Sequence, residues 1–344
     1  MKKHISYPKI AQFRNIVATI NREIEYTGLD EEGNAVYDKS IKKPTLTFKG
    51  TVKLHGTNAS VCFNSIDGFW IQSRQNIITS EKDNAGFAFF AESHKVELCS
   101  LIDKIVNENQ IDTNIYTVSI YGEWAGKGVQ KSVGISELDK AFYVFGVKIS
   151  KPQDEEFNAY WLDSSNVKNT DCRIFNVEDY ETYSIDVDFN IPQLAQNKFA
   201  EITEQVEKEC PISKAFGIDN GLGEGVVWSV EHKGNTHRFK VKGDKHSVTK
   251  VKKLASVDVE KLKNIQEFVE YSVTENRFNQ AIENVFGKDD LDVKRMGDFL
   301  RWIIKDITSE EMDTMVANSL EPKDVNKYIS NKAREMFFKA QNQY

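Results

Sequence analysis

Short apolar runs that alternate with polar residues occupy the first two-thirds of the chain. The runs richest in β-branched and aromatic side chains span residues 45–52, 59–63, 69–73, 116–123, 142–149, 225–230 and 236–241. A period of two places successive side chains on opposite faces of a strand, so each run is predicted to be a strand. The last two flank Lys233-Gly234-Asn235 and are expected to pair across that turn. The first two are expected to meet at the His55-Gly56-Thr57-Asn58 bend.

Apolar residues recur at helical spacing over residues 87–101, which predicts a helix there. Many short strands with sparse helices favour antiparallel sheets over a doubly wound parallel sheet. The fold class predicted for residues 1–250 is therefore α+β, built on antiparallel sheets.

The period changes at about residue 258. From there on, apolar side chains recur every three or four residues, namely Leu262, Ile265, Phe268, Val269, Phe278, Ile282, Phe286, Phe299, Trp302, Ile303 and Ile307. This spacing is typical of helices with one buried face. We therefore predict a small all-helical domain over residues 258–344, joined to the first domain by a linker at residues 251–257.

Composition is that of a globular protein with more than one core. The chain has 344 residues, of which 40% are hydrophobic and 28% charged, enough for one large domain and a smaller one. No apolar run approaches the ~20 residues of a membrane span, and no apolar segment of a secretory signal follows the basic start. The cysteines, Cys62, Cys99, Cys172 and Cys210, form no C-x-x-C pair. We expect no structural zinc site, no membrane partner and a cytoplasmic location.

The net charge of −7 is unevenly distributed. Residues 238–253 hold seven Lys or Arg against Asp244 alone, and such a stretch can bind a phosphate backbone even in an acidic protein. A solvated face is an equally good interpretation of that stretch by itself. Residues 154–188 hold ten acids against Lys168 and Arg173. We interpret this second segment as a solvated loop rather than an insertion that repels nucleic acid.

Lys53 is the candidate nucleophile. A neutral amine attacks and an ammonium does not, and nearby cations favour the neutral form by lowering the lysine pKa. Lys240 and Lys242 alternate on one strand, so both point to the same face and are candidates to face Lys53 and a triphosphate. Gly56 would let the backbone approach a ligand closely. Lys53 alone would be taken for a surface lysine; the ordered set of motifs favours chemistry.

Carboxylates and an aromatic residue complete the candidate chemistry. Glu123 ends an alternating strand, where it could accept a ribose hydroxyl or face a metal. Glu224 lies between two glycines at the start of an apolar strand; Mg²⁺ is held by few carboxylates together with substrate phosphates. Phe145 is either a core residue or a platform for a base. Arg74 is a candidate to hold a phosphate with two hydrogen bonds.

Taken in order, these motifs resemble those of the covalent nucleotidyltransferase superfamily of ATP-dependent ligases and mRNA-capping enzymes. More narrowly, the chain is similar to the RNA ligase 2 family of phage and kinetoplastid RNA ligases. The motifs that carry the resemblance are Lys53-Leu54-His55-Gly56-Thr57-Asn58, Gly122-Glu123-Trp124-Ala125-Gly126 with Gly128 and Gln130, Phe142-Tyr143-Val144-Phe145, Glu224-Gly225-Val226-Val227, Phe239-Lys240-Val241-Lys242 and Thr274-Glu275-Asn276-Arg277.

The resemblance implies an ATP-grasp-like ligase domain and an ATP-dependent RNA ligase that uses Mg²⁺ or Mn²⁺. It implies a lysyl-AMP at Lys53, transfer of AMP to an RNA 5′-phosphate, and attack by the adjacent 3′-hydroxyl, with nicked duplex RNA as the expected substrate in RNA repair. A monomer is expected. The implied roles are ribose binding by Glu123, adenine stacking by Phe145, metal and lysine organisation by Glu224, nucleotide binding by Gly56, α-phosphate binding by Lys240 and Lys242, and RNA binding by Asn58, Arg74, Lys245 and Arg277.

One position departs from the family pattern. Val52 precedes the nucleophile where the family often carries a glutamate that reads the adenine amino group, and a valine side chain accepts no hydrogen bond. The alternatives are a DNA ligase or an mRNA-capping guanylyltransferase, which usually append a β-barrel domain that the helical tail disfavours. A non-catalytic RNA-binding protein on this scaffold is disfavoured because the lysines and glutamates are present together.

Overall fold

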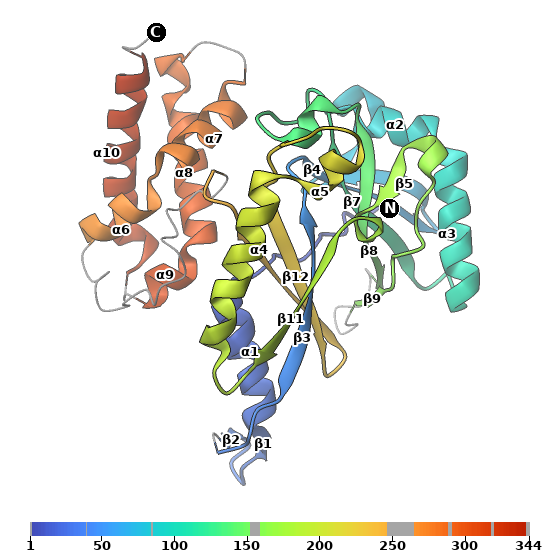
Figure 1. Cartoon of the computed structure of the whole chain (residues 1–344), viewed down its shortest axis with the longest axis horizontal. Helices are drawn as coiled ribbons and strands as arrows, with labels where there is room; N and C mark the ends of the chain where they lie inside the picture. The colour runs from blue at the N-terminus through green and yellow to red at the C-terminus, as the bar shows by residue number, and fades with distance from the viewer. Residues whose placement is uncertain are drawn as a thin grey trace. The chain divides into compact units, whose positions relative to one another are not determined.

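The computed structural model comprises two compact units, Met1–Gly243 and Asp244–Tyr344 (Figure 1). It describes residues 2–38, 40–83, 85–151, 159–245, 265–287, 291–317 and 320–341. The predicted linker, residues 251–257, lies outside the described residues, as does the predicted boundary at residue 250.

Two antiparallel sheets form the first unit, as predicted. The larger sheet has the strand order β10-β8-β7-β4-β5-β6, with β9 beside β8 and only the β10–β8 pair parallel. Its strands are β4 (Thr57–Asn64), β5 (Gly68–Ser73), β6 (Ile77–Ile78), β7 (Thr117–Ala125), β8 (Ala141–Ser150), β9 (Tyr160–Leu162) and β10 (Ile174–Asn176). The smaller sheet, in the order β11-β3-β12-β13, contains β3 (Thr45–Lys53), β11 (Thr182–Asp188), β12 (Gly225–His232) and β13 (Asn235–Lys242). A separate hairpin pairs β1 (Tyr26–Leu29) with β2 (Ala35–Tyr37).

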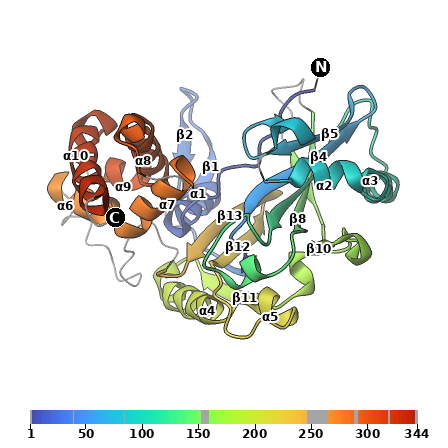
Figure 2. The same ribbon diagram turned by 90° about the horizontal axis from the view of Figure 1, so that it is seen from above.

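Helices cover one face of each sheet (Figures 1 and 2). On the larger sheet, α2 (Phe87–Ser93) and α3 (Lys95–Asn109) bury Val61 and Ile120. On the smaller sheet, α1 (Phe13–Glu25) and α4 (Gln196–Lys208) bury Phe48 and Phe239, and the short α5 (Pro211–Ala215) adds Ile212 to the same core. The single helix predicted over residues 87–101 is in fact two, because His94 leaves the helical conformation between them.

The opposite faces of the two sheets carry the polar side chains. In β3 the buried Phe48 and Val52 alternate with Thr51 and Lys53, which therefore lie on the face away from α1 and α4. β3 and β4 follow each other in the chain but do not form a hairpin. β3 pairs with β11 and β12, whereas β4 pairs with β5 and β7. The bend at residues 54–56 thus carries the chain from one sheet to the other.

The N-terminal segment runs across the uncovered face of the larger sheet. The Tyr121 hydroxyl donates to the Ile5 carbonyl at 2.6 Å, and the Gln72 side chain both donates to and accepts from the Ile5 backbone. Ala11 then bridges to Phe239 of β13. Residues 2–11 therefore link the polar face of one sheet to the last strand of the other.

The acidic segment is structured wherever the chain is described. Residues 159–188 contain β9, β10 and β11, and β11 pairs with β3 along its whole length. The interpretation of this segment as a solvated loop is therefore wrong for residues 159–188. Ile185 and Val187 alternate with Asp186, so the acids line the outer face of an edge strand.

The second unit is helical throughout its described residues, as predicted. It contains α6 (Ile265–Ser272), α7 (Glu275–Val285), α8 (Met296–Glu310), α9 (Met312–Ala317) and α10 (Pro322–Gln341). Its core is formed by Phe268, Phe299, Ile303, Ile329 and Phe337, of which the first three come from the predicted helical period. Across the described residues, no helix combines the length and the apolar character needed to cross a membrane.

Candidate active site

One buried carboxylate gathers three basic side chains at the start of β12. The Lys53 ammonium donates to Glu224 Oε2 at 2.5 Å, and Lys242 Nζ lies 3.0 Å from Oε1. His55 Nδ1 is 3.6 Å from Oε2. The Glu224 side chain is only 2% exposed, whereas Lys53, His55 and Lys242 are each 19–20% exposed. The cations, not the anion, are therefore the groups that a ligand can reach.

Strand register explains why these groups meet. Gly225 pairs with Lys53 on one side and with Lys242 on the other, so both lysines flank the residue that follows Glu224. Gly225 has φ +149°, and a Cβ there would clash with the Val241 carbonyl. The backbone at Gly225 consequently lies close against β13 and brings the Glu224 carboxylate between the two lysines.

The charges in this cluster hold one another ionised. Burial by itself raises the pKa of Glu224, but Lys53, Lys242 and His55 outweigh it and hold that pKa well below its usual value. Burial lowers the pKa of Lys53, and Glu224 together with Glu123 more than reverses this, so the net shift is upward. The expectation that neighbouring cations lower the Lys53 pKa is wrong in this structure, because the nearest charge is the Glu224 carboxylate.

A second carboxylate lies on the facing sheet. Glu123 Oε1 accepts the Gly56 backbone N–H at 3.0 Å, and Asn58 pairs with Glu123 across β4 and β7. A Cβ at Gly56 would overlap the Trp124 carbonyl, so only glycine lets the bend approach β7 this closely. Burial raises the pKa of Glu123 to about 7, with Lys53 opposing the shift. Glu123 is thus poised between its acid and carboxylate forms near neutral pH.

Phe145 is the extra residue of a β-bulge. Tyr121 pairs with Gly146 and Gly122 with Val144, so Phe145 has no partner across the β7–β8 ladder. Bulges next to active sites redirect a side chain. The Phe145 ring meets the Tyr7 ring edge to face, with centroids 5.2 Å apart.

Three further predicted residues are Lys240, Arg74 and Lys245. Lys240 lies two residues before Lys242, on the same face of β13. Arg74 is exposed and follows Ser73 at the end of β5; its charge acts on Lys53 by lowering the Lys53 pKa. Lys245 is exposed and belongs to the second unit.

Arg277 has a different environment from the one predicted. Its side chain is 1% exposed, and the guanidinium donates to Asp306 at 2.8 Å, to the Ser272 carbonyl at 2.5 Å and to Glu311 at 3.5 Å. A guanidinium engaged in this way has no face turned to a ligand. We therefore correct the assignment of Arg277 as an RNA-binding residue to a residue that holds α7 to α8.

Three residues of the site were missed or left unassigned from the sequence. His55 is part of the lysine motif and contacts Glu224, which its position two residues after Lys53 on the bend could have suggested. Gln130 donates to the Gly56 carbonyl at 3.4 Å. Tyr7 has no signal in the sequence, because its contact with Phe145 depends on the path of the N-terminal segment.

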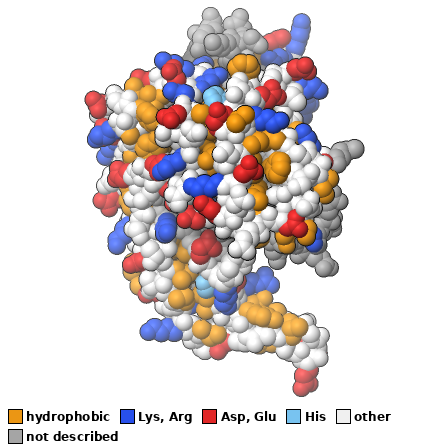
Figure 3. Space-filling model, turned by 90° about the vertical axis from the view of Figure 1, so that its right-hand side faces the viewer, with side chains coloured by type: hydrophobic (Ala, Val, Ile, Leu, Met, Phe, Trp, Pro, Cys, Tyr) orange, Lys and Arg blue, Asp and Glu red, His pale blue; other side chains and the backbone are white. Residues whose placement is uncertain are grey.

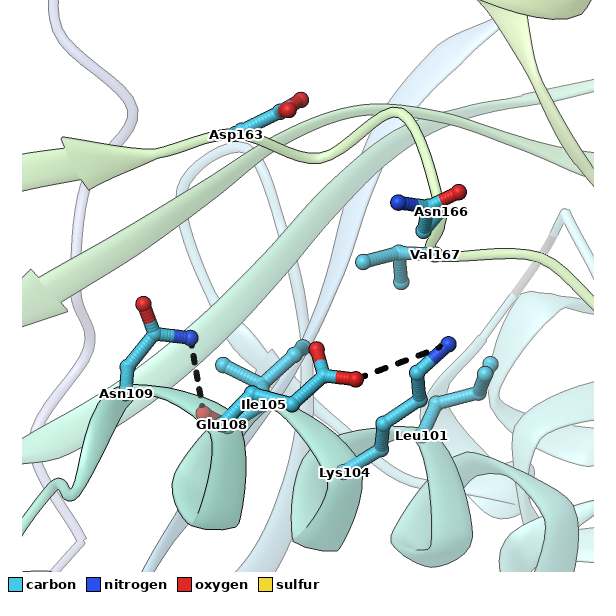
Figure 4. Close-up of a pocket in the computed structure, with 8 residues that line it drawn as sticks. All are labelled: Leu101, Lys104, Ile105, Glu108, Asn109, Asp163, Asn166 and Val167. Carbon is cyan, nitrogen blue, oxygen red and sulfur yellow. Dashed lines mark hydrogen bonds and ion pairs between the residues drawn. The ribbon is translucent and has the colours of Figure 1, made fainter.

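A hollow elsewhere on the first unit holds none of these residues (Figure 4). It has a volume of about 180 Å³ and lies between α3 and the residues after β9, with Lys104 and Glu108 3.9 Å apart on one wall. Basic and acidic side chains are interspersed over the face seen in Figure 3, the right-hand side of Figure 1. Neither feature gathers charged side chains as the Glu224 cluster does.

The family model of RNA ligase matches residues 47–242, more than half of the chain. The chain belongs to the RNA ligase family. The matched range begins in β3, ends at Lys242, and so contains Lys53, Glu123 and Glu224. This confirms the resemblance to the RNA ligase family that was drawn from the motifs.

Solved structures of a Naegleria gruberi RNA ligase are similar to this chain at low identity. The structure with PPi is 15% identical with a TM-score of 0.42, and a variant with ATP and Mn is 16% identical with a TM-score of 0.43. Each match covers 70% of this chain and 56% of the other, so the chain spans little more than half the length of these ligases. Among curated proteins, none matches the chain.

The residues at the site fit a divalent cation only in part. Within the described ranges, no group of three or more His, Cys, Asp or Glu side chains can hold a metal ion. Glu224 and Glu123 offer carboxylate oxygens near Lys53, and Mg²⁺ commonly binds one or two carboxylates with substrate phosphates and water. A metal at this site would therefore be held jointly by Glu224 and the substrate.

Proposed function

We propose that this RNA ligase is ATP-dependent and forms a lysyl-AMP at Lys53. Lys53 Nζ attacks the α-phosphorus of ATP, a P–N bond forms, and pyrophosphate leaves. The AMP then passes to the 5′-phosphate of an RNA, which regenerates the amine of Lys53. Attack by the adjacent 3′-hydroxyl on that activated phosphate forms the phosphodiester and releases AMP.

The cluster around Glu224 is the observation that carries this proposal. It puts Lys53 and Lys242 within 3.0 Å of one carboxylate, and Lys240 lies two residues from Lys242 on the same face of β13. Three lysines on one face attract a polyphosphate, and cations positioned at a transferring phosphoryl group stabilise the charge that develops on it. In this proposal Glu123 on the facing sheet accepts a ribose hydroxyl and Phe145 stacks on adenine.

The proton on Lys53 is the obstacle to the first step. The ammonium, stabilised by Glu224 and Glu123, must lose its proton before the nitrogen attacks. A divalent cation bound to Glu224 and the ATP phosphates, Mg²⁺ or Mn²⁺, would supply positive charge that weakens the hold of Glu224 on the ammonium. His55, 3.6 Å from the same carboxylate, keeps Glu224 oriented between the lysines.

The second and third steps of the proposed reaction require an RNA substrate. Asn58 pairs with Glu123 across β4 and β7, and Arg74 follows β5, the strand next to β4. In this proposal both residues contact the RNA 5′-phosphate. We propose nicked duplex RNA as the substrate, with the 3′-hydroxyl and 5′-phosphate held side by side by the complementary strand.

Incubation of the protein with a divalent cation and α-labelled ATP, or α-labelled GTP in parallel, tests the first step. Label from ATP that survives denaturing electrophoresis is expected. Label from GTP alone would instead indicate a capping guanylyltransferase. Absence of label with either nucleotide, in protein that intact-mass analysis shows to be free of AMP, would contradict the proposal. Sealing of a nicked RNA duplex, compared with a nicked DNA duplex, then tests the substrate.

A further inference from the structure

Arg238 lies in the same row as the two lysines of β13. Phe239 is fully buried beneath the smaller sheet, so the alternate residues Arg238, Lys240 and Lys242 share the opposite, site-bearing face. The lysines are assigned to the phosphates in the proposed function. Arg238 lies two residues before Lys240 on β13, and the proposed reaction does not use it.

The Arg238 side chain crosses to the other sheet. Its guanidinium carbon lies 4.1 Å from the ring centroid of Trp161, within cation–π range. Trp161 belongs to β9, which pairs with β8 of the larger sheet. The Trp161 ring lies over Gly146, where an added Cβ would come within 3.0 Å of it. The Arg238–Trp161 contact therefore joins the two sheets next to the bulge that carries Phe145.

Trp161 is connected to Phe145 through one further ring. The Tyr7 ring lies edge to face against Trp161 at 5.3 Å and against Phe145 at 5.2 Å. Aromatic pairs at this separation are favourable and directional. Burial raises the pKa of Tyr7 and lowers that of Arg238, as expected for groups packed away from water. Arg238, Trp161, Tyr7 and Phe145 thus form one continuous chain of side-chain contacts.

We propose that Arg238 and Trp161 clamp the two sheets together and, through Tyr7, position Phe145 for the base of the bound nucleotide. This inference rests on the proposed function of the site. It makes Arg238 a positioning residue for the nucleobase, although its row on β13 would suggest a phosphate ligand. Val52 has no carboxylate that could bind the base. The proposal therefore identifies the packing around Phe145 as a source of base affinity in this chain.

The test separates base binding from phosphate binding and from chemistry. Equilibrium binding of α,β-methylene-ATP, which cannot transfer AMP, is measured by calorimetry for wild type, Arg238→Met and Trp161→Leu, with tripolyphosphate as a ligand that has no base. Loss of a desolvated cation–π contact is expected to weaken binding of the analogue about tenfold in both variants. Binding of tripolyphosphate is expected to stay within about twofold of wild type, since Lys240 and Lys242 are unchanged.

Three results would overturn the clamp. Equal weakening of the analogue and tripolyphosphate by Arg238→Met would make Arg238 a phosphate ligand, and unchanged binding of both would leave it without a role at the site. Arg238→Lys and Trp161→Phe, which keep the charge or an aromatic ring, are expected to restore part of the affinity and guard against a folding defect. If these milder variants bind the analogue no better than Arg238→Met and Trp161→Leu while their thermal unfolding matches wild type, the clamp is also wrong.

Arg22→Met is the matched control. Its guanidinium lies 5.4 Å from the ring of Tyr37 and donates to the Tyr37 hydroxyl, and Tyr37 is not a residue of the site. It should leave binding of both ligands unchanged. Because the readout is binding of a non-reactive analogue, failure of the proposed function, seen as a wild type that forms no protein–AMP, remains distinguishable from failure of the clamp.

Discussion

Each compact unit contains a buried ion cluster, and the two are built in opposite ways. In the first unit one carboxylate, Glu224, is surrounded by Lys53, Lys242 and His55. In the second unit one guanidinium, that of Arg277, is surrounded by Asp306 and Glu311. The two clusters bury their central charge equally, at 2% and 1% exposure.

The difference lies in which charges reach solvent. Around Glu224 the surplus is positive and the lysines are about one-fifth exposed, so an incoming phosphate meets cations. Around Arg277 the surplus is negative and the cation is sealed, so a phosphate would be repelled. A buried ion pair is therefore no sign of a reactive site until the sign and exposure of its surplus charge are known.

Lys53→Ala should have the largest effect. It removes the nucleophile, so protein–AMP formation from labelled ATP should be abolished, while sealing of RNA that already carries a 5′-adenylate should remain measurable. Lys49→Ala, on the exposed face of the same strand, is the control and should label as wild type. Persistent labelling of Lys53→Ala would show that another residue is the nucleophile.

Arg277→Met should destabilise the helical unit and spare the chemistry. Removing one partner of a buried ion pair leaves uncompensated charge and typically costs about 3–5 kcal/mol. Faster hydrogen exchange in peptides of α7 and α8 measures the loss, with adenylylation unchanged. Arg301→Ala, which breaks an exposed pair with Asp298 on α8, should cost at most about 0.5 kcal/mol. Equal exchange in the two variants would remove the structural role given to Arg277.

Glu224→Gln should slow protein–AMP formation and leave the helical unit unchanged, the reverse of Arg277→Met. The amide keeps the size of the side chain but loses the charge, and loss of one organised electrostatic group typically lowers a rate about 10²-fold. The rate of protein–AMP formation at saturating ATP measures this. Glu231→Gln, at an exposed position of the same strand, should leave the rate unchanged. An adenylylation rate near that of wild type in Glu224→Gln would place the electrostatic work elsewhere.

Glu123→Gln should change the pH dependence of stability by a smaller amount. Burial raises the folded pKa of Glu123 to about 7, above the ordinary 4.5, so the native state binds this proton more tightly than the unfolded chain. Stability from this group is full below about pH 4.5 and is lost as pH rises through 7, by about 2 kcal/mol after allowing for partial exposure. Urea unfolding at pH 5 and pH 8 should show that loss in wild type and not in Glu123→Gln. Parallel pH profiles would contradict the raised pKa.

The sequence predicts the strands well because alternation is a local property. The pairing of residues 226–230 with 236–241 is confirmed, and Val226 pairs with Val241 as the alternation implies. The break of the first helix at His94 was not predicted, because apolar spacing continues through it. The acidic residues around Asp186 hide a strand, since charge on an edge strand looks the same as charge on a loop.

The sequence predicts that Lys53, Glu224 and Lys242 meet, but it does not predict how their charges affect one another. Lys53, Glu224 and Lys242 come together because strand register brings them together, and motif order anticipates that. The direction of the Lys53 pKa shift depends on which charge is nearest, a distance that a sequence does not contain. The same limit hid the contact of Tyr7 with Phe145, which joins the N-terminal segment to β8.

The central claim is that the amine in the Glu224 cluster is the group that carries AMP. Protein incubated with ATP and a divalent cation, digested and sequenced by mass spectrometry, tests it directly. The account predicts AMP on the peptide that contains Lys53, linked to that side chain and absent from Lys53→Ala. AMP found on Lys240, Lys242 or any other residue of the wild-type protein would contradict it.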